Sequence, residues 1–303
     1  MIRGTLEPNL NLMSETIHPP EEKWVSVNDI DICYLDWGGE GEPLLALHGL
    51  ASSSHWYDLM APNLQAKYHV IAPDQRGHGK TTQADSGYDW ETLASDAIAL
   101  LDTLNISSAS VFGHSWGATV ALNVAARFPD RVTHLGLLDG GFSSNPTSMG
   151  TWEDFKIRAK PRDVSGTREE FLSRLREQLS FCWNEDVERI VQTMVYEDKS
   201  GQINDILRPE NHQQVMRAIW EEPAASVYDK ISCPTVLIPA RPTRRRANSE
   251  RALLKQEAVK YAEQTIPNCQ VEWILETVHD IGYHKPLELA RTMENFLRLP
   301  EST

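Results

Sequence analysis

The first half of the chain alternates between short apolar segments of strand length and longer segments with helical spacing. Apolar and β-branched residues predict strands at 23–30, 31–37, 43–47, 68–72, 109–113 and 132–138. Residues 56–67 and 90–104 have helical spacing, and in the second segment leucine and alanine recur at three- and four-residue steps. Strands that alternate with helices are typical of a parallel sheet covered on both faces.

The pattern changes in the middle of the chain. Residues 142–229 contain several helical stretches with many aromatic side chains, and no segment there convincingly predicts a strand. The alternation then resumes, with strands predicted at 233–239 and 270–275 and helices at 250–264 and 286–299. A helical insertion within a single α/β sheet is the simplest interpretation of this order.

These patterns divide the chain into a core and an insertion. We predict an α/β core over 23–141 and 230–303, with a helical insertion over 142–229. We expect residues 1–22 to form a poorly ordered N-terminal extension. That segment has one arginine and no sustained apolar run, so it does not have the pattern of a secretory signal peptide.

Composition narrows the range of partners. The chain is 41% hydrophobic, which is ample for a packed core, and its formal net charge of −14 argues against nucleic acid or an anionic membrane as a partner. No apolar segment has the length of a membrane span. The four cysteines lie far apart, without the spacing of a zinc site or a disulfide framework. By default we expect a cytoplasmic monomer or homodimer.

One five-residue stretch has a pattern that predicts a reactive side chain. Residues 113–117 have the pattern Gly-x-Ser-x-Gly, directly after a predicted strand and directly before a helical run. Such a pattern places the serine at a sharp strand-to-helix turn, where the flanking backbones approach too closely for side chains. The strand before and the helix after it favour an exposed, reactive Ser115 over an incidental glycine-rich turn.

A serine needs a base and two N–H donors before it can cleave an ester. Of the ten histidines, His279 is best placed, because it follows the last predicted strand by a short loop at the carboxyl end of the sheet. His284 is its main rival, and His114 adjoins the serine. The N–H of Trp116 would be the first donor, and the N–H of Leu50, in the glycine-containing loop after strand 43–47, would be the second.

Several motifs in this order resemble those of the α/β-hydrolase superfamily. They are His-Gly-Leu at 48–50, Asp-Gln-Arg-Gly-His-Gly at 74–79, the serine motif at 113–117, and His279 followed seven residues later by Pro286. More narrowly, the chain resembles the esterase, non-haem haloperoxidase-like and C–C hydrolase group that carries a helical cap. The resemblance runs from about residue 24 to 299.

The resemblance implies a fold and a set of roles. The fold is the α/β-hydrolase fold: a mostly parallel eight-stranded sheet flanked by helices, with a helical cap inserted after the sixth strand. Ser115 would be the nucleophile, His279 the base, and Leu50 and Trp116 the N–H donors. Residues 74–79 would form a structural loop near the site, with Arg76 bound to backbone or carboxylate partners.

The acid of the triad departs from the common pattern of that superfamily. Relatives often carry aspartate a few residues after the strand that matches 234–238, where this chain has Thr243 and no acid before Glu250. Some relatives place the acid at the end of the preceding strand, where this chain has Asp139 followed by two glycines. We predict Asp139, which gives the order Ser115, Asp139, His279, and keep Glu250 as the alternative.

The resulting hypothesis is a serine hydrolase that cleaves a small-molecule carboxylic ester or lactone without metal or organic cofactor. One alternative is hydrolysis of C–C bonds by the same triad, and another is a non-catalytic ligand-binding receptor of the same fold. A serine at the nucleophile position disfavours haloalkane dehalogenase and epoxide hydrolase, which need a carboxylate there. The basic cluster at 241–246 either steers an anionic substrate or, as we favour, is a solvated surface patch.

Overall fold

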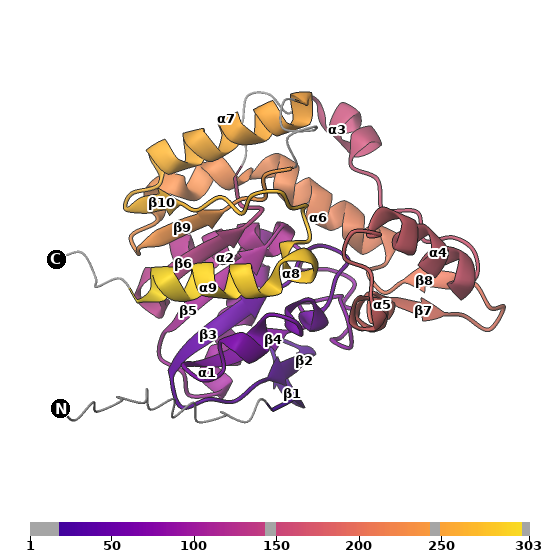
Figure 1. The fold of residues 1–303 in the computed structure, drawn as a ribbon, viewed down its shortest axis with the longest axis horizontal. Helices are drawn as coiled ribbons and strands as arrows, with labels where there is room; N and C mark the ends of the chain where they lie inside the picture. Colours follow the sequence, from indigo (N-terminus) through magenta and orange to yellow (C-terminus); the bar gives the residue numbers. More distant parts are fainter. Residues whose placement is uncertain (1–17, 143–149, 243–248, 299–303) are drawn as a thin grey trace, which may run out of the picture.

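The centre of the molecule is an eight-stranded sheet (Figure 1). In this computed structural model, the described residues are 18–142, 150–242 and 249–298. The strands, in spatial order, are β1 (Glu21–Val27), β2 (Ile30–Asp36), β4 (Tyr68–Pro73), β3 (Glu42–Leu47), β5 (Ala109–His114), β6 (Val132–Leu138), β9 (Thr235–Ile238) and β10 (Cys269–Val271). The pairs β1–β2 and β2–β4 are antiparallel and the remaining pairs are parallel, which confirms the predicted mostly parallel sheet.

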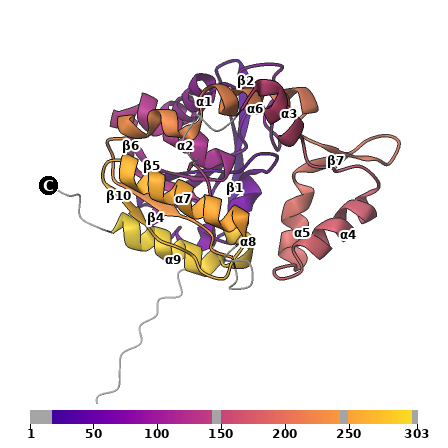
Figure 2. The same cartoon turned by 90° about the horizontal axis from the view of Figure 1, so that it is seen from above.

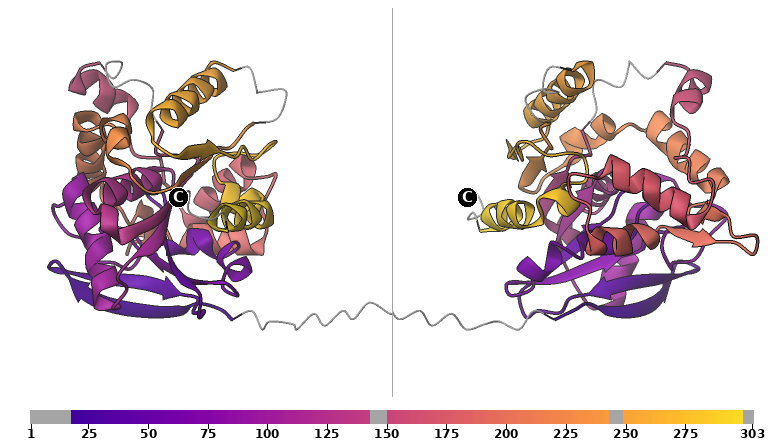
Figure 3. Two further views of the ribbon diagram at one scale, coloured as in Figure 1. Left: turned by 90° about the vertical axis from the view of Figure 1, so that its left-hand side faces the viewer. Right: turned by 45° about the vertical axis from the view of Figure 1, so that its right-hand side comes forward.

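Helices cover both faces of this sheet (Figures 1 and 3). One apolar core lies under α1 (Trp90–Thr103), α2 (Trp116–Arg127) and α7 (Glu250–Thr265). The other lies under α8 (Ile281–His284), α9 (Pro286–Leu297) and two 3₁₀ helices, η1 (Ser54–Tyr57) and η2 (Ala61–Asn63). The central strands are buried from both sides, so tight packing fixes the positions of the loops at their carboxyl ends.

The predicted helix at 56–67 is wrong. The structure has η1 and η2 there, joined by turns. Pro62 lies within η2 and has no N–H to donate to a preceding turn, so the apolar spacing of this segment cannot be realised as one continuous α-helix.

The chain leaves the sheet after β6 and returns to it at β9. The inserted elements are α3 (Trp152–Arg158), α4 (Arg168–Gln178), α5 (Glu185–Gln192), β7 (Val195–Glu197), β8 (Ile203–Asp205), α6 (Pro209–Glu221) and the 3₁₀ helix η5 (Ala224–Lys230). The prediction that this segment lacks strands is wrong, because β7 and β8 form a small antiparallel sheet. Each is only three residues long, too short to show an alternating pattern.

The insertion is anchored to the core at one end and projects from it at the other. Helix α6 packs against the core, where the Trp90 Nε1–H donates to the carbonyls of Ala218 at 3.2 Å and Glu222 at 2.8 Å. In contrast, α4, α5 and β7 form a lobe beside the core (Figure 2). Of the expected insertion at 142–229, residues 143–149 lie outside the described part.

The beginning of the chain is described from residue 18 onwards. Strand β1 starts at Glu21, so the last two residues of the extension expected at 1–22 belong to the sheet instead. Residues 1–17 lie outside the described part. Within the described ranges, none of the helices combines the length and the apolar character needed to span a membrane.

Candidate active site

Ser115 lies between β5 and α2 in a strained backbone conformation. Its φ of 54° and ψ of −118° are unusual for a residue other than glycine. The Ser115 N–H donates to the Leu138 carbonyl at 2.9 Å, which fixes the turn against β6. A Cβ at Gly113 would lie 2.1 Å from the Gly117 carbonyl oxygen, and one at Gly117 would lie 2.3 Å from that of His48. Both glycines of the motif are therefore required by close backbone approach.

The structure brings Ser115, His279 and Asp139 together, although they lie far apart in the sequence. His279 Nε2 is 2.9 Å from Ser115 Oγ, and His279 Nδ1 is 2.7 Å from Asp139 Oδ2. With the proton on Nδ1, that N–H donates to the carboxylate, and Nε2 is free to accept the serine proton. The three groups thus form an unbroken chain from hydroxyl to imidazole to carboxylate.

Asp139 is held more firmly than a residue in an ordinary strand-end turn. Only 1% of its side chain is exposed, and its φ is 42°. The Ala240 N–H donates to Oδ1 at 2.8 Å, and the Lys255 ammonium donates to Oδ1 at 2.8 Å and to Oδ2 at 2.9 Å. A Cβ at the following Gly140 would lie 2.1 Å from the Ser115 carbonyl oxygen, so this turn packs directly against the serine turn.

The pKa values of Asp139 and His279 are shifted in opposite directions. Burial raises the pKa of Asp139, but the hydrogen bond and charge of His279, together with Lys255, outweigh burial and lower it below its usual value. For His279, burial lowers the pKa, but the hydrogen bond and charge of Asp139 and the nearby Asp280 outweigh burial and raise it above its usual value. Asp139 therefore favours the protonated, charged form of His279.

The loop expected to supply the second N–H lies against the serine. A Cβ at Gly49 would be 3.2 Å from Ser115 Cβ, so the loop at 48–50 passes directly beside the reactive side chain. Leu50 and Ser115 line the same cavity. Trp116 is the first residue of α2, where backbone N–H groups have no acceptor within the helix. The roles of Leu50 and Trp116 as oxyanion donors stay predictions.

Two buried histidines fix this loop. The Gln75 N–H donates to His48 Nε2 at 3.0 Å, and the Ala51 N–H donates to His78 Nε2 at 3.1 Å. Burial lowers the pKa of His48 to about 4 and that of His78 to about 3. Both rings therefore stay neutral near pH 7 and keep an unprotonated nitrogen as acceptor.

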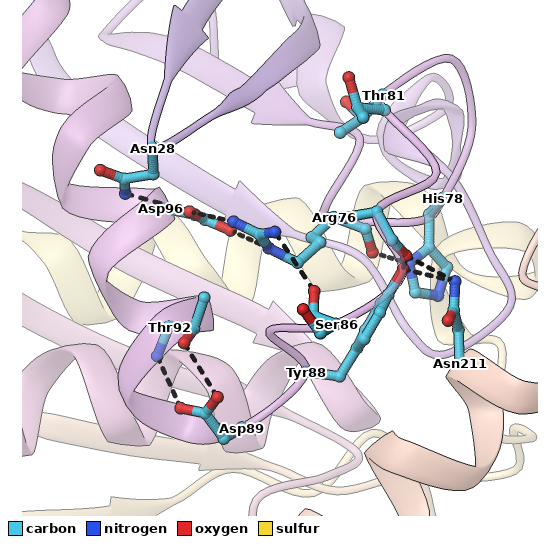
Figure 4. A network of polar contacts seen from close by, with 12 residues as sticks. Asn28, Arg76, His78, Thr81, Ser86, Tyr88, Asp89, Thr92, Asp96 and Asn211 are labelled. Carbon is cyan, nitrogen blue, oxygen red and sulfur yellow. Dashed lines mark hydrogen bonds and ion pairs between the residues drawn. The ribbon is translucent and has the colours of Figure 1, made fainter.

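The loop at 74–79 is structural, and Arg76 has the partners expected of it (Figure 4). Arg76 donates to the Asp96 carboxylate through Nε at 2.7 Å and Nη2 at 3.0 Å, with both side chains buried, and through Nη1 to the Ser86 carbonyl at 3.4 Å. Asn28 donates to the same carboxylate at 3.1 Å. This network joins the loop to α1 and to the turn between β1 and β2.

The two rival histidines and the rival acid take no part in the hydrogen bonds that link Ser115, His279 and Asp139. His284 Nδ1 is 3.0 Å from Thr277 Oγ1, and its ring packs edge-on against Phe181. His114 Nε2 donates to the His279 carbonyl at 3.0 Å and so helps to hold that loop. Glu250 is an exposed residue at the start of α7. Thr243 and the arginines at 244–246 lie outside the described residues.

A cavity of about 270 Å³ opens onto Ser115 and His279. Its core side includes the aromatic rings of Trp56 and Tyr283. Its other side comes from the insertion, through Arg162, Leu175, Gln178, Leu179, Val191 and Met194. The sequence pattern did not single out any of these residues as lining a cavity, because apolar residues at helical spacing equally predict a packed core. In the described ranges, no group of three or more histidine, cysteine or acidic residues could hold a metal ion.

Comparison with known proteins identifies the fold that carries this site. The family model for the alpha/beta hydrolase fold matches residues 42–180, which include β3 to β6 and the serine motif. The crystal structure of E-2-(acetamidomethylene)succinate hydrolase superposes with a TM-score of 0.75 over 92% of this chain and 100% of its own, at 19% identity. The match over residues 42–180 supports the predicted resemblance to the α/β-hydrolase superfamily. The chain's mostly parallel eight-stranded sheet with flanking helices is that of the α/β-hydrolase fold.

Curated relatives in this superfamily differ in activity. The cis-3-alkyl-4-alkyloxetan-2-one decarboxylase of Shewanella oneidensis is 31% identical over 148 residues, which cover 46% of each chain. The haloalkane dehalogenase of Mesorhizobium japonicum is 29% identical over 209 residues, which cover 67% of this chain and 65% of that relative. The matches span less than two thirds of the length of either relative, and the two relatives differ in activity, so the resemblance leaves the reaction open.

Proposed function

We propose that this protein is a serine hydrolase that cleaves a carboxylic ester or lactone through an acyl-enzyme on Ser115. The observation that carries the proposal is the chain of two short contacts, 2.9 Å from Ser115 Oγ to His279 Nε2 and 2.7 Å from His279 Nδ1 to Asp139 Oδ2. A serine hydroxyl is a weak nucleophile until a base removes its proton, and this geometry supplies the base and the acid that orients it.

In the first half of the reaction, His279 Nε2 takes the Ser115 proton as Oγ attacks the ester carbonyl. Asp139 stabilises the imidazolium that forms, since its carboxylate is fixed and favours the charged ring. The N–H groups of Leu50 and Trp116 would stabilise the negative oxygen of the tetrahedral intermediate. His279 then gives its proton to the departing alcohol, which leaves an acyl group on Ser115.

In the second half, the same residues release the acyl group. His279 takes a proton from water, which attacks the acyl carbonyl, and the proton passes to Ser115 Oγ as the acid leaves. Without hydrolysis of this intermediate the enzyme would stop after one turnover. In a lactone the alcohol and the acid belong to one molecule, so the released product is a single hydroxy acid.

The nucleophile argues against two activities found among relatives of this fold. A dehalogenase or epoxide hydrolase reaction needs a carboxylate to form an ester with the substrate carbon, and this chain has Ser115 at that position. The name of the Shewanella relative contains an oxetan-2-one, a cyclic ester, which agrees with a carbonyl as the reacting group in this part of the superfamily. A receptor that had lost catalysis would not need the complete chain from Ser115 to Asp139.

We assign the insertion at 142–229 as a cap that shapes the substrate cavity. Leu175, Leu179, Val191 and Met194 give this side of the cavity an aliphatic surface. A cavity of about 270 Å³ suits an acyl or alcohol group of medium size. We therefore expect esters of short to medium aliphatic acids to be better substrates than esters of long-chain acids.

The test is a substrate panel with the purified full chain. p-Nitrophenyl esters of two to twelve carbons, aliphatic lactones and a vinylogous diketone are assayed in parallel with Ser115→Ala as the control. We expect ester or lactone turnover that disappears in the variant. Turnover of the diketone alone would replace the proposal by C–C hydrolysis, and the absence of any Ser115-dependent turnover would refute it.

A further inference from the structure

A lysine outside the expected catalytic set contacts the acid of the site. Lys255 lies on α7, and its ammonium group is 2.8 Å from Asp139 Oδ1 and 2.9 Å from Oδ2. The same ammonium donates to the Ala240 carbonyl at 3.2 Å. The Lys255 side chain is 23% exposed, while that of Asp139 is 1% exposed, so the carboxylate is almost fully removed from water on this side.

These contacts use the whole donor capacity of the lysine. An ammonium group has three N–H donors, and here they face two carboxylate oxygens and one carbonyl. Lys255 is therefore directed at Asp139 and at the loop after β9, and it has no donor left for a substrate. That loop, where many relatives carry the acid, contributes the Ala240 N–H and carbonyl in this chain and thereby supports an acid on the neighbouring strand.

We propose that Lys255 is a positioning residue of this site: it fixes the Asp139 carboxylate through both of its oxygens and reduces the negative charge that His279 experiences. The inference rests on the proposed function, since it concerns the same acid and base. It assigns to α7 a part in the chemistry beyond packing against the sheet.

The charges around His279 give the direction of the effect. Asp139 faces its ring from the turn after β6, His114 faces it from β5, and Asp280 follows it in the loop. Lys255 reaches the same region from α7. His279 also lines a second cavity, of about 670 Å³. Four other charged or titratable side chains line that cavity: Glu177, Arg251, Glu276 and His284. The positive charge of Lys255 lowers the pKa of His279, against the larger effect of Asp139 that raises it.

Removing that positive charge should therefore make His279 a stronger base that is protonated at higher pH. In Lys255→Met we expect the midpoint of the acid limb of kcat/KM to move up by about 0.5 to 1 pH unit. We also expect the plateau of kcat/KM to fall by about tenfold, because the carboxylate is held less firmly. Lys255→Arg keeps the charge, so its acid limb should return close to that of the wild type.

The matched control is Lys260→Met. Lys260 is exposed on the same helix, so its replacement removes the same charge at a distance from the site. Lys255→Gln serves as a second neutral variant if the methionine protein does not fold. An acid limb that stays in place or moves to lower pH in a folded neutral variant would overturn the proposal, as would an equal shift in Lys260→Met.

A measurement on the unmodified protein needs neither turnover nor a variant. The Nζ resonance of Lys255 and the ring resonances of His279 are followed by NMR during a pH titration. We expect the Lys255 signal to shift at the pH where His279 titrates, because both contact one carboxylate. A Lys255 resonance whose chemical shift stays constant while His279 titrates would contradict the inference. In contrast, a wild-type protein that hydrolyses no ester or lactone would refute the proposed function and leave this coupling testable.

Discussion

The end of the sheet that carries Ser115 and the insertion that faces it are built in different ways. At the sheet end, Ser115 and Asp139 both have positive φ, and glycines at 113, 117 and 140 allow backbones to meet at distances that exclude a side chain. In the insertion, helix α4 buries only Phe171 and starts with a capping box at Thr167.

Polar contacts near the surface support the insertion. Arg162 pairs with Asp205 at 2.9 Å, and Arg176 pairs with Glu188 at 2.9 Å with both side chains partly exposed. Pairs of this kind contribute little to stability, whereas overlapping backbones cannot be relieved without moving a strand. Under the proposed function, the rigid sheet end would fix where the chemistry occurs, and the insertion would decide which substrates fit.

The largest effect is expected at the acid. Asp139→Asn should lower kcat/KM by about 10³- to 10⁴-fold, because the amide no longer orients His279 and no longer stabilises its charged form. Steady-state kinetics on the preferred ester would measure this loss. Glu250→Gln is the matched control and should retain wild-type activity. Near-normal turnover in Asp139→Asn together with a large loss in Glu250→Gln would reverse the assignment of the acid.

The next effect compares one glycine from each region. Gly117→Ala should reduce the free energy of unfolding by about 3 kcal/mol, because the new Cβ would lie 2.3 Å from the carbonyl oxygens of His48 and Leu47. Gly201→Ala in the insertion should cost about 1 kcal/mol, since its φ of 82° is strained for alanine but the added atom meets only open space and Glu197 Oε1 at 3.9 Å. Urea denaturation would measure both, and equal losses would contradict the comparison.

The pH dependence follows from the raised pKa of His279. The base must be neutral to take the serine proton, so kcat/KM should fall as pH drops through a midpoint above 6.5, the ordinary value for histidine. Below that midpoint the loss should be about tenfold per pH unit. Residual activity in Asp139→Asn should show a lower midpoint, because the carboxylate that raises the pKa has gone. A midpoint that rises in this variant would contradict the assignment.

The smallest effect is expected in the insertion. Val191→Ala should change KM for medium-chain esters by about three- to tenfold while kcat stays within about threefold, because Val191 lines the cavity from α5 and is not part of the Ser115–His279–Asp139 contacts. Val187→Ala is the matched control, since Val187 is equally buried on α5 but lies outside the cavity wall. A change in chain-length preference that is the same in both variants would mean that α5 does not shape substrate selection.

The sequence predicted best what local patterns encode. Strand β6 has the predicted bounds, and β5 and α2 flank the serine motif as expected, because apolar runs and glycines mark these elements locally. Helix α7 likewise matches its prediction within one residue. The helix expected at 56–67 is absent. Its prediction used apolar spacing alone and did not take into account that Pro62 has no backbone N–H to donate.

The parts that the sequence did not reveal depend on long-range contacts. Lys255 is 116 residues from Asp139 and lies on a helix with no local pattern that marks it. The cavity wall comes from α4, α5 and the turn after α5, whose aliphatic residues have ordinary helical spacing. Asp139 could be inferred because two glycines follow it and because the resemblance to the superfamily limited the choices. No comparable signal distinguished Trp56 or Tyr283 as lining residues.

The most direct test of the account is covalent labelling of the folded protein with a fluorophosphonate, followed by peptide mass spectrometry. The phosphorus is attacked only by a serine that its base activates, so reaction reports the chain from Ser115 to Asp139 without knowledge of the substrate. We expect one adduct, on Ser115, that forms much more slowly in Asp139→Asn and is absent in Ser115→Ala. A folded wild-type protein without an adduct on Ser115, or with the adduct on another serine, would contradict it.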